Sequence, residues 1–344
     1  MVTRRIVLRD SLLAGGTALI ALSLSQFGAV AEESLSIHGA GSTFSAPLYK
    51  KWIEVFQRDH DQVSLSYDVV GSGEGVARFV HGSVDFGATD VLPGEATFDG
   101  VERGVIAVPV TAGMIVLAYN LPGLTGALKL SREAYSAIFT GAIRKWDDPR
   151  ILETNTDLDL PDTDIAVVVR QDSSGTTAAF TSHLVAIGSS WQAAGAGEGF
   201  SIEWPAAAMQ GKGNEGVASK IKISEGSIGF VEYGFAKRLG LKMAILENAA
   251  GEYVTPNEAA GMAALLASRS GSTANPPGDA SYPIVTMSWL LLYKKYDSPR
   301  KASALKDWIR WGLTKGQTFA ADLGYIPLPP ETAGLAQRAL DSLS

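Results

Sequence analysis

Hydrophobic and polar residues follow two alternating periods along most of the chain. Residues 63–67 alternate between apolar and polar side chains, which predicts a strand with one buried face. Just before them, Leu48, Trp52, Val55 and Phe56 recur at the spacing of one helix face. The same patterns predict further helices at 131–139, 176–187 and 215–223, and further strands at 35–38, 105–120, 165–170, 228–231 and 284–293. Because helices and strands alternate, we expect an α/β fold.

Local signals near the C-terminal end predict where two helices begin. Thr255 is followed by Pro256 and, three positions on, by Glu258, which predicts Thr255 as the N-cap of a helix that runs through Ser268. The Ser-Pro pair at 298–299 predicts the start of another helix.

Two breaks in the pattern predict where the chain passes between lobes. Residues 120–123, Asn-Leu-Pro-Gly, end a long apolar strand, and residues 271–283 form a loop rich in Gly, Ser, Pro and Asn before another. A chain of 344 residues is long for one domain, so two are expected. With two crossings, one lobe comprises 32–120 plus 284–344, and the other comprises 121–283.

The N-terminus has the pattern of an export signal. Arg4, Arg5 and Arg9 precede an apolar stretch from Leu12 to Leu24, and Ala-Val-Ala at 29–31 forms a small-residue cleavage site. The adjacent arginines favour a twin-arginine signal over a general secretory one. We therefore predict a signal peptide over 1–31 and an exported protein, and the family resemblance given below implies the periplasm as its location. A membrane anchor is the weaker alternative, because the apolar stretch is short and interrupted by glycines.

Composition narrows the classes of function. The sequence has no cysteine, which excludes disulfides and thiolate metal sites, and none of its four histidines has metal-ligand spacing. No later apolar run reaches the ~20 residues needed to cross a bilayer. The net charge is −7, and it becomes more negative without the signal, which disfavours nucleic-acid binding. An anion site therefore requires donors without net charge, such as backbone N–H groups and hydroxyls.

Two glycine-rich segments provide such donors. Residues 39–47, Gly-Ala-Gly-Ser-Thr-Phe-Ser-Ala-Pro, form a turn at a predicted helix N-terminus, where free N–H groups and the Thr43 hydroxyl favour an anion. The alternative is a tight turn with Ser45 as the helix N-cap. Residues 71–76 again lie between a strand and a helix, and Ser72 is the second neutral donor, unless this segment is an ordinary surface loop.

Two further segments contain charged groups. Asp90 ends a short strand, where it can accept the proton that phosphate retains near neutral pH and repel sulfate, which has none. Its alternative role is a turn or N-cap aspartate. In residues 170–177, Arg170 can hold two anion oxygens while Asp172 orients it, and Ser174, Gly175 and Thr176 open a helix. The alternative is a surface Arg–Asp pair beside a capped helix.

Two other motifs are typical of a dinucleotide site and of a hydrolase, but each lacks neighbouring sequence features that such a site requires. Residues 211–216 match the glycine pattern of dinucleotide sites, but the preceding residues make a poor strand, so we interpret the segment as a loop that opens a helix. The serines near 174 are compatible with a hydrolase. However, the sequence has no G-x-S-x-G elbow and only His38, His60, His81 and His183 as possible bases.

Taken together and in this order, the segments resemble the periplasmic phosphate-binding protein of the bacterial phosphate-specific transport (Pst) system. The resemblance extends from about residue 35 to residue 330. It rests on residues 39–47, 84–90, 143–149, 170–177, 211–216, 226–233 and 324–329.

The resemblance implies a type II, two-lobed periplasmic-binding-protein-like fold with the ligand in the interdomain cleft. It implies no enzymatic activity and no cofactor or metal. The expected partners are inorganic phosphate and the permease subunits of an ABC transporter, with the protein itself a monomer. The positions that match the ligand-binding residues of the family are Thr43, Phe44 through its backbone N–H, Ser72, Asp90, Arg170, Ser174, Gly175 and Thr176, supported by Asp172.

The chain departs from the family pattern at Glu74, Gln171 and Ser173. Of these, Glu74 would repel an anion if it pointed inward.

Two alternative functions remain open. One is a binding protein for another oxyanion, such as sulfate or molybdate. The other is an exported phosphatase with a serine nucleophile.

Overall fold

A mixed sheet forms the centre of the chain in the computed structural model, which describes residues 34–188, 190–268 and 273–344. The predicted signal peptide lies outside the described residues, as do the first two residues of the 271–283 loop. The strands are β1 (Leu35–Gly41), β2 (Val63–Val69), β3 (Phe86–Thr89), β4 (Val105–Asn120), β5 (Lys129–Leu130), β6 (Ala166–Arg170), β7 (Met209–Gly211), β8 (Ser227–Glu232), β9 (Lys242–Met243), β10 (Ile245–Glu247), β11 (Tyr253–Val254) and β12 (Val285–Tyr293).

Helices connect most of these strands. They are α1 (Ala46–Phe56), α2 (Ser72–Val80), η1 (Glu95–Phe98), α3 (Arg132–Thr140), α4 (Pro149–Leu152), α5 (Gly175–Ile187), α6 (Ser190–Ala193), α7 (Gly213–Ile223), α8 (Tyr233–Leu239), α9 (Glu258–Ala267), α10 (Pro299–Leu313), η2 (Lys315–Phe319), α11 (Ala320–Leu323) and α12 (Pro330–Asp341). Each strand and helix predicted from periodicity overlaps an observed one, which confirms the α/β prediction.

The order of strands in the large sheet is β2-β1-β3-β12-β4-β8-β6-β7, with β9 also paired to β4. It contains two sets of parallel strands: β1 with β2 and β3, and β6 with β7 and β8. Within a parallel set the carboxyl ends meet at one edge of the sheet, which is where open α/β sheets bind ligands. The sheet therefore has two such edges, and helices begin after strands that end at each of them.

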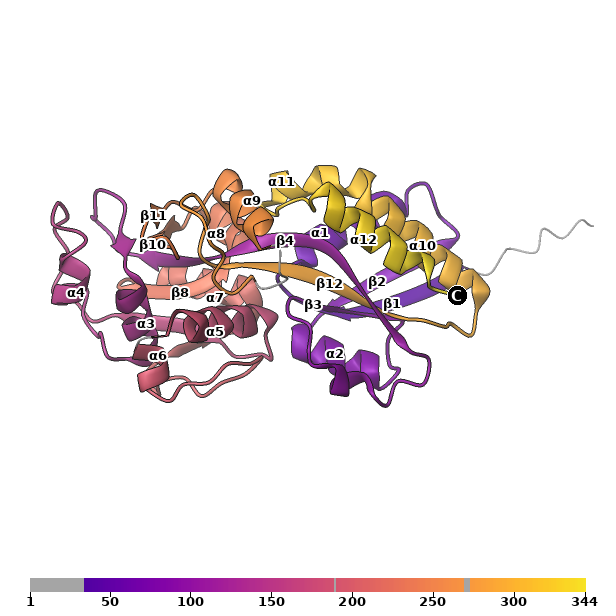
Figure 1. Cartoon of the computed structure of the whole chain (residues 1–344), viewed down its shortest axis with the longest axis horizontal. Helices are drawn as coiled ribbons and strands as arrows, with labels where there is room; N and C mark the ends of the chain where they lie inside the picture. Colours follow the sequence, from indigo (N-terminus) through magenta and orange to yellow (C-terminus); the bar gives the residue numbers. More distant parts are fainter. Residues whose placement is uncertain (1–33, 189, 269–272) are drawn as a thin grey trace, which may run out of the picture. The chain divides into compact units, whose positions relative to one another are not determined.

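Two long strands join these sets (Figure 1). β12 is antiparallel to β3 and β4, and β4 changes partner along its length, pairing with β12 up to Met114 and with β8 from Ile115. The pairing of β12 with β4 shifts register between Ser288 and Trp289, opposite Pro109. A proline is tolerated at such an irregularity because it has no N–H to donate to the ladder.

Apolar side chains from all these elements form one continuous core. In the N-terminal part of the sheet, α10 and α12 lie on one face and α2 lies on the other (Figure 1). Trp52 of α1 and Trp308 of α10 are fully buried there, and the Trp52 indole N–H donates to the Gly316 carbonyl at 2.8 Å. Within the described residues, no helix has the length and apolar content required to cross a bilayer.

The predicted N-cap of α9 is wrong by two residues. Asn257, not Thr255, caps this helix, and its Oδ1 accepts the Ala260 N–H at 2.9 Å. Its Nδ2 also donates to the Thr255 carbonyl oxygen at 3.0 Å. One asparagine side chain thus closes the preceding turn and caps the helix, so the proline stays outside the helix.

Close packing of α2 against β1 depends on Gly75. A Cβ at this position would lie 2.3 Å from the Gly41 Cα and 2.8 Å from the Ala40 carbonyl oxygen. Only a residue without a side chain allows the helix to approach the strand backbone this closely. This packing sets the position of the N-terminus of α2, where Ser72 lies.

Glu232 is a buried acid between β8 and α8. Its carboxylate caps α8 by accepting the Gly234 N–H at 2.6 Å and the Phe235 N–H at 3.1 Å. Burial raises the pKa of Glu232 to about 8, although these N–H groups and Arg238 act in the opposite direction. The folded state therefore holds a proton on Glu232 over a pH range in which an unfolded glutamate has lost it.

Substituting Gly75 by alanine is expected to lower the free energy of unfolding by about 1–3 kcal/mol, because the new methyl group overpacks the contact with β1. Gly334 of α12 provides the matched control, since the nearest atom to its added Cβ would be Arg338 Nη1 at 3.5 Å. Gly334→Ala should stabilise the protein by about 0.5–1 kcal/mol. Urea unfolding of both variants measures this, and a similar gain in both would contradict the packing argument.

Between about pH 4.5 and 8, unfolding releases the Glu232 proton, so this group makes stability fall as pH rises. Glu232→Gln removes the titration. The wild type should therefore lose stability relative to this variant by at most about 1.4 kcal/mol per pH unit across this range. Urea titrations of both proteins at pH 5, 6, 7 and 8 test this, and a stability difference that is independent of pH would refute it.

Candidate anion-binding site

The predicted site residues follow the carboxyl ends of the two sets of parallel strands. Segment 42–45 follows β1, Ser72 follows β2 and Asp90 follows β3, whereas Arg170 ends β6 and the residues after it open α5. These positions are far apart in sequence, yet hydrogen bonds and backbone contacts connect them. All of the predicted ligand-binding residues are buried: Thr43, Phe44, Ser72, Asp90, Arg170, Ser174, Gly175 and Thr176.

Serine hydroxyls surround the Asp90 carboxylate. Ser42 Oγ lies 2.7 Å from both carboxylate oxygens, Ser288 Oγ donates to Oδ1 at 2.8 Å, and Ser72 Oγ donates to Oδ2 at 3.2 Å. The Thr286 hydroxyl holds the Asp90 backbone by donating to its carbonyl oxygen at 2.6 Å. Asp90 is therefore neither a helix cap nor a surface turn residue but a buried acid that is hydrogen-bonded to three serines.

Arg170 and Asp172 form a second buried group. The guanidinium donates to Asp172 through both Nε, at 2.9 Å to Oδ1, and Nη2, to Oδ2. Its Nη1 donates to the Thr176 hydroxyl at 3.1 Å. Because the Arg170 side chain is only 1% exposed, the alternative of a surface Arg–Asp pair does not apply.

The two acids have opposite pKa shifts. Burial raises the pKa of Asp90, and the hydroxyls of Ser42 and Ser288 and the charge of Arg170 offset only part of this effect. Burial also acts to raise the pKa of Asp172, but hydrogen bonds from Arg170 and its charge outweigh it, so the pKa is lowered. Asp172 is thus a stable counter-charge for Arg170, whereas Asp90 is a stronger base than an exposed aspartate.

Asn214 joins the two halves of the site. From the first turn of α7 its Nδ2 donates at 3.1 Å to both the Thr43 and the Thr176 hydroxyl oxygens. Its Oδ1 accepts the Glu232 N–H at 2.9 Å, and the Gly213 N–H donates to Asp172 Oδ1 at 2.8 Å. The strand ends of both parallel sets therefore meet in a single polar network.

Glycines allow the two sets of segments to approach. A Cβ at Gly175 would lie 2.4 Å from Ser72 Oγ and 2.7 Å from Asp90 Oδ2. On the same side, the Gly73 N–H donates to the Ser173 carbonyl oxygen at 3.1 Å. The N-terminus of α5 thus lies directly against the N-terminus of α2, and both present the positive end of a helix dipole to the same region.

Two predicted donors have local partners. The Phe44 N–H donates to Ser42 Oγ at 3.0 Å, within the turn before α1. Ser174 is the N-cap of α5, and its Oγ accepts the Thr177 N–H at 3.0 Å. Ser45 occupies the N-cap position of α1 as the alternative interpretation held, but its side chain makes no capping bond, and its Oγ instead lies 2.8 Å from Ser288 Oγ.

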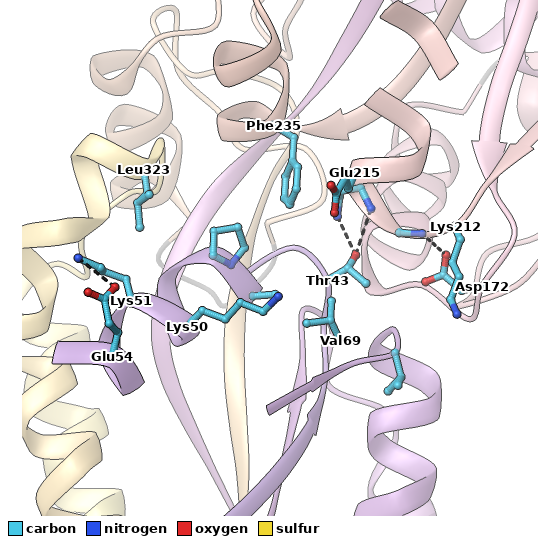
Figure 2. A pocket seen from close by; sticks show the side chains of 15 residues that line it. Thr43, Lys50, Lys51, Glu54, Val69, Asp172, Lys212, Glu215, Phe235 and Leu323 are labelled. Atoms are coloured by element: carbon cyan, nitrogen blue, oxygen red, sulfur yellow. Dashed lines mark hydrogen bonds and ion pairs between the residues drawn. The ribbon is translucent and has the colours of Figure 1, made fainter. Parts of the chain in front are cut away.

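A cavity of about 590 Å³ adjoins the network (Figure 2). Thr43, Asp172 and Lys212 line one end of it, and Lys51, Glu54 and Leu323 line the other. Thr43 and Asn214 belong both to the network and to the cavity wall, so the cavity reaches the Thr43 side of the network.

Sequence reasoning missed three members of the network: Ser42, Asn214 and Ser288. Ser42 lies inside a predicted segment, and Asn214 lies inside the 211–216 segment that was interpreted only as a loop opening a helix. That interpretation is confirmed, since α7 begins at Gly213, but a short strand, β7, precedes it after all. Ser288 carries no local signal, because it is one polar residue within an apolar strand.

The departures at Glu74, Gln171 and Ser173 do not place a charge in the site. Glu74 is half exposed and binds Arg78 Nε at 2.8 Å, so it points away from Asp90. Gln171 is exposed, and its backbone N–H donates to Gly211. Ser173 takes part through its backbone contact with Gly73.

This arrangement is suited to an oxyanion that carries a proton. Hydroxyls and helix N-termini supply neutral donors, Arg170 supplies one full positive charge that Asp172 partly balances, and Asp90 supplies a buried acceptor. Within the described residues, no group of three or more histidine, aspartate or glutamate side chains is placed to hold a metal ion.

Comparison with known proteins agrees with this chemistry. Residues 28–315 match the model of a PBP superfamily domain. The chain is 37% identical to the phosphate-binding protein PstS of Pasteurella multocida over 91% of this chain and 92% of that protein. It is 36% identical to the PstS protein of Haemophilus influenzae over 86% of this chain and 90% of that protein.

Solved structures agree at the level of the fold. A high affinity periplasmic phosphate-binding protein, PfluDING, bound with phosphate, superposes with a TM-score of 0.71 at 21% identity, covering 88% of this chain and 93% of that one. This likeness confirms the predicted periplasmic-binding-protein-like fold class. The chain therefore belongs to the PBP superfamily and, within it, to the family of the phosphate-binding proteins named PstS.

Proposed function

We propose that this chain is the solute-binding component of an ABC importer, which binds inorganic phosphate and delivers it to the membrane permease. The observation that carries the proposal is the buried acceptor Asp90 beside a set of neutral donors and one guanidinium. Membership of a family whose relatives are named phosphate-binding proteins supports the same ligand.

The chemistry of phosphate fits both parts of this arrangement. Near neutral pH phosphate keeps at least one proton, which it donates to the Asp90 carboxylate in a charge-assisted hydrogen bond. Its other oxygens accept hydrogen bonds from hydroxyls, backbone N–H groups and Arg170. Sulfate has no proton to donate, so its oxygens repel Asp90 and leave that acceptor unsatisfied. The raised pKa of Asp90 makes it a better acceptor for this proton.

The residues proposed to contact phosphate are those identified from the sequence, with Asp172 holding Arg170 in place. They are Thr43, Phe44, Ser72, Asp90, Arg170, Ser174, Gly175 and Thr176. The backbone N–H of Phe44 would have to exchange its bond to Ser42 for one to the ligand.

We assign the lobes as residues 32–120 plus 284–344 and residues 121–283. The ligand-binding residues 43–90 then belong to one lobe and residues 170–176 to the other. Since β4 and β12 are the strands that join the two parallel sets, bending along them would open the site, and phosphate would favour the closed form because it contacts both lobes.

The remaining assignments follow from the family and the sequence. The protein acts in the periplasm after export, as a monomer that meets permease subunits of the transporter, and it uses no cofactor. A serine phosphatase is less compatible with the site. The hydrogen bonds of the four histidines, all of which are described, lead to groups other than Ser174.

Titration calorimetry with phosphate, arsenate, sulfate and molybdate at neutral pH tests the ligand. Phosphate and arsenate, which both carry a proton, should bind, whereas sulfate should bind at least about 100-fold more weakly because it repels Asp90. In the Asp90→Asn variant the gap between phosphate and sulfate should narrow to within about 10-fold. Equal binding of phosphate and sulfate by the wild type would rule out this role of Asp90, and steady hydrolysis of a phosphate ester would favour the phosphatase.

Arg170→Ala is expected to weaken phosphate binding about 100-fold or more, because the buried anion loses the one formal positive charge among its proposed contacts. Arg150 is the matched control: it forms the same bidentate pair with the aspartate two positions away, Asp148, through Nε and Nη2 at 3.0 Å each. Arg150→Ala should leave the dissociation constant unchanged. Circular dichroism verifies that both variants fold, and an unaltered affinity in Arg170→Ala would remove this residue from the site.

A further inference from the structure

The orientation of the Asn214 side-chain amide is determined by its surroundings. The Glu232 backbone N–H can only donate, so the atom that it meets at 2.9 Å must be the amide oxygen of Asn214. The amide nitrogen therefore faces Thr43 and Thr176, and its two hydrogens serve one hydroxyl each, both at 3.1 Å. Asn214 is completely buried.

This orientation decides what the two threonine hydroxyls can do. A hydroxyl has two acceptor lone pairs and one hydrogen to donate. Thr43 Oγ1 accepts from both the side-chain and the backbone nitrogen of Asn214, the latter at 3.3 Å. Thr176 Oγ1 accepts from Asn214 and from Arg170 Nη1. With both lone pairs occupied, each hydroxyl keeps only its hydrogen for another partner.

Those hydrogens are not used within the described part of the protein. Among the hydrogen bonds of residues 34–188, 190–268 and 273–344, the Thr43 and Thr176 hydroxyls occur only as acceptors. The opposite polarity occurs at Asp90, whose carboxylate accepts from Ser42, Ser72 and Ser288. The site therefore has one side that only donates and one side that only accepts.

We propose that Asn214 is the residue that gives the site this polarity: it directs both threonine hydrogens toward the ligand and so determines which phosphate oxygens carry the proton. Unprotonated oxygens then face Thr43 and Thr176, and the protonated oxygen faces Asp90. Asn214 acts through the two threonines as a positioning and specificity-determining residue. The inference rests on the proposed function and deepens it.

Two substitutions of Asn214 distinguish an effect of hydroxyl orientation on phosphate affinity from an effect of lost packing. Asn214→Ala leaves the threonine hydroxyls free to rotate, and we expect phosphate affinity to fall about 10-fold. Asn214→Asp keeps the shape, but one carboxylate oxygen still meets the Glu232 N–H and the other accepts the hydrogens of both threonines. The ligand then loses two donors and gains a negative neighbour, so affinity should fall about 100-fold or more. Calorimetry with inorganic phosphate measures both.

A double-mutant cycle with Thr43→Val tests whether Asn214 acts through the hydroxyl. Without the Thr43 hydroxyl, one of the two groups that Asn214 directs is gone, so Asn214→Ala should cost only about 3-fold in this background. A purely structural role would give the same factor in both backgrounds.

Asn155 supplies the control for loss of a buried amide. Its side chain is 1% exposed, donates at 2.8 Å to the carbonyl oxygens of Lys129 and Ile151, and accepts the Lys129 N–H at 2.9 Å. The Asn155 side chain therefore makes three hydrogen bonds to the backbone, and the Asn214 side chain also makes three hydrogen bonds in total. None of the bonds of Asn155 leads to a proposed ligand-binding residue. Asn155→Ala should lower the melting temperature and leave phosphate affinity unchanged.

The outcomes distinguish this inference from the proposed function. If the wild type binds phosphate and the Asn214→Asp variant binds it equally well, or if Asn214→Ala costs the same factor with and without the Thr43 hydroxyl, the inference is wrong and the function stands. If the wild type does not bind phosphate, both are wrong. Weaker binding by both Asn214 variants, with a smaller loss in the Thr43→Val background, supports the inference.

Discussion

A carboxylate that is 98% removed from solvent, that of Asp90, is the constraint on which the rest of the site depends. An ion of this kind loses its hydration on folding, and the loss must be offset by hydrogen bonds and opposite charge. Ser42, Ser72 and Ser288 supply the bonds from the end of β1, the start of α2 and the middle of β12. The need to satisfy one acid thus holds three separate segments together.

The burial of Asp90 also explains why the positive charge of Arg170 is held by other groups. Arg170 lies close enough to lower the pKa of Asp90, but its guanidinium is engaged by Asp172 and by the Thr176 hydroxyl. Because Asp172 binds it on two nitrogens, the site retains both a positive field and a distinct basic oxygen, and a protonated anion requires both.

The topology makes this combination possible in an acidic protein. Two sets of parallel strands, joined by β4 and β12, bring several helix N-termini and strand ends together. Helix N-termini and hydroxyls provide favourable potential without formal charge, so the net charge of −7 does not oppose local anion binding. Glycines at positions 75 and 175 allow these backbone segments to approach one another closely.

The sequence alone predicted the main strands and helices, and it identified the segments around Thr43, Ser72, Asp90 and Arg170, because strand ends and glycine-rich turns before a helix are local patterns. It misplaced the α9 cap, since Thr255 and Asn257 are both acceptable caps and only the turn geometry chooses between them. It did not identify Ser288, which lies 198 positions from Asp90, or Asn214, whose side-chain amide binds Thr43, Thr176 and the Glu232 N–H. Hydrogen-bond partners such as these are decided by the tertiary structure, because the direction of a hydroxyl or an amide depends on groups that are distant in the chain and adjacent only after folding.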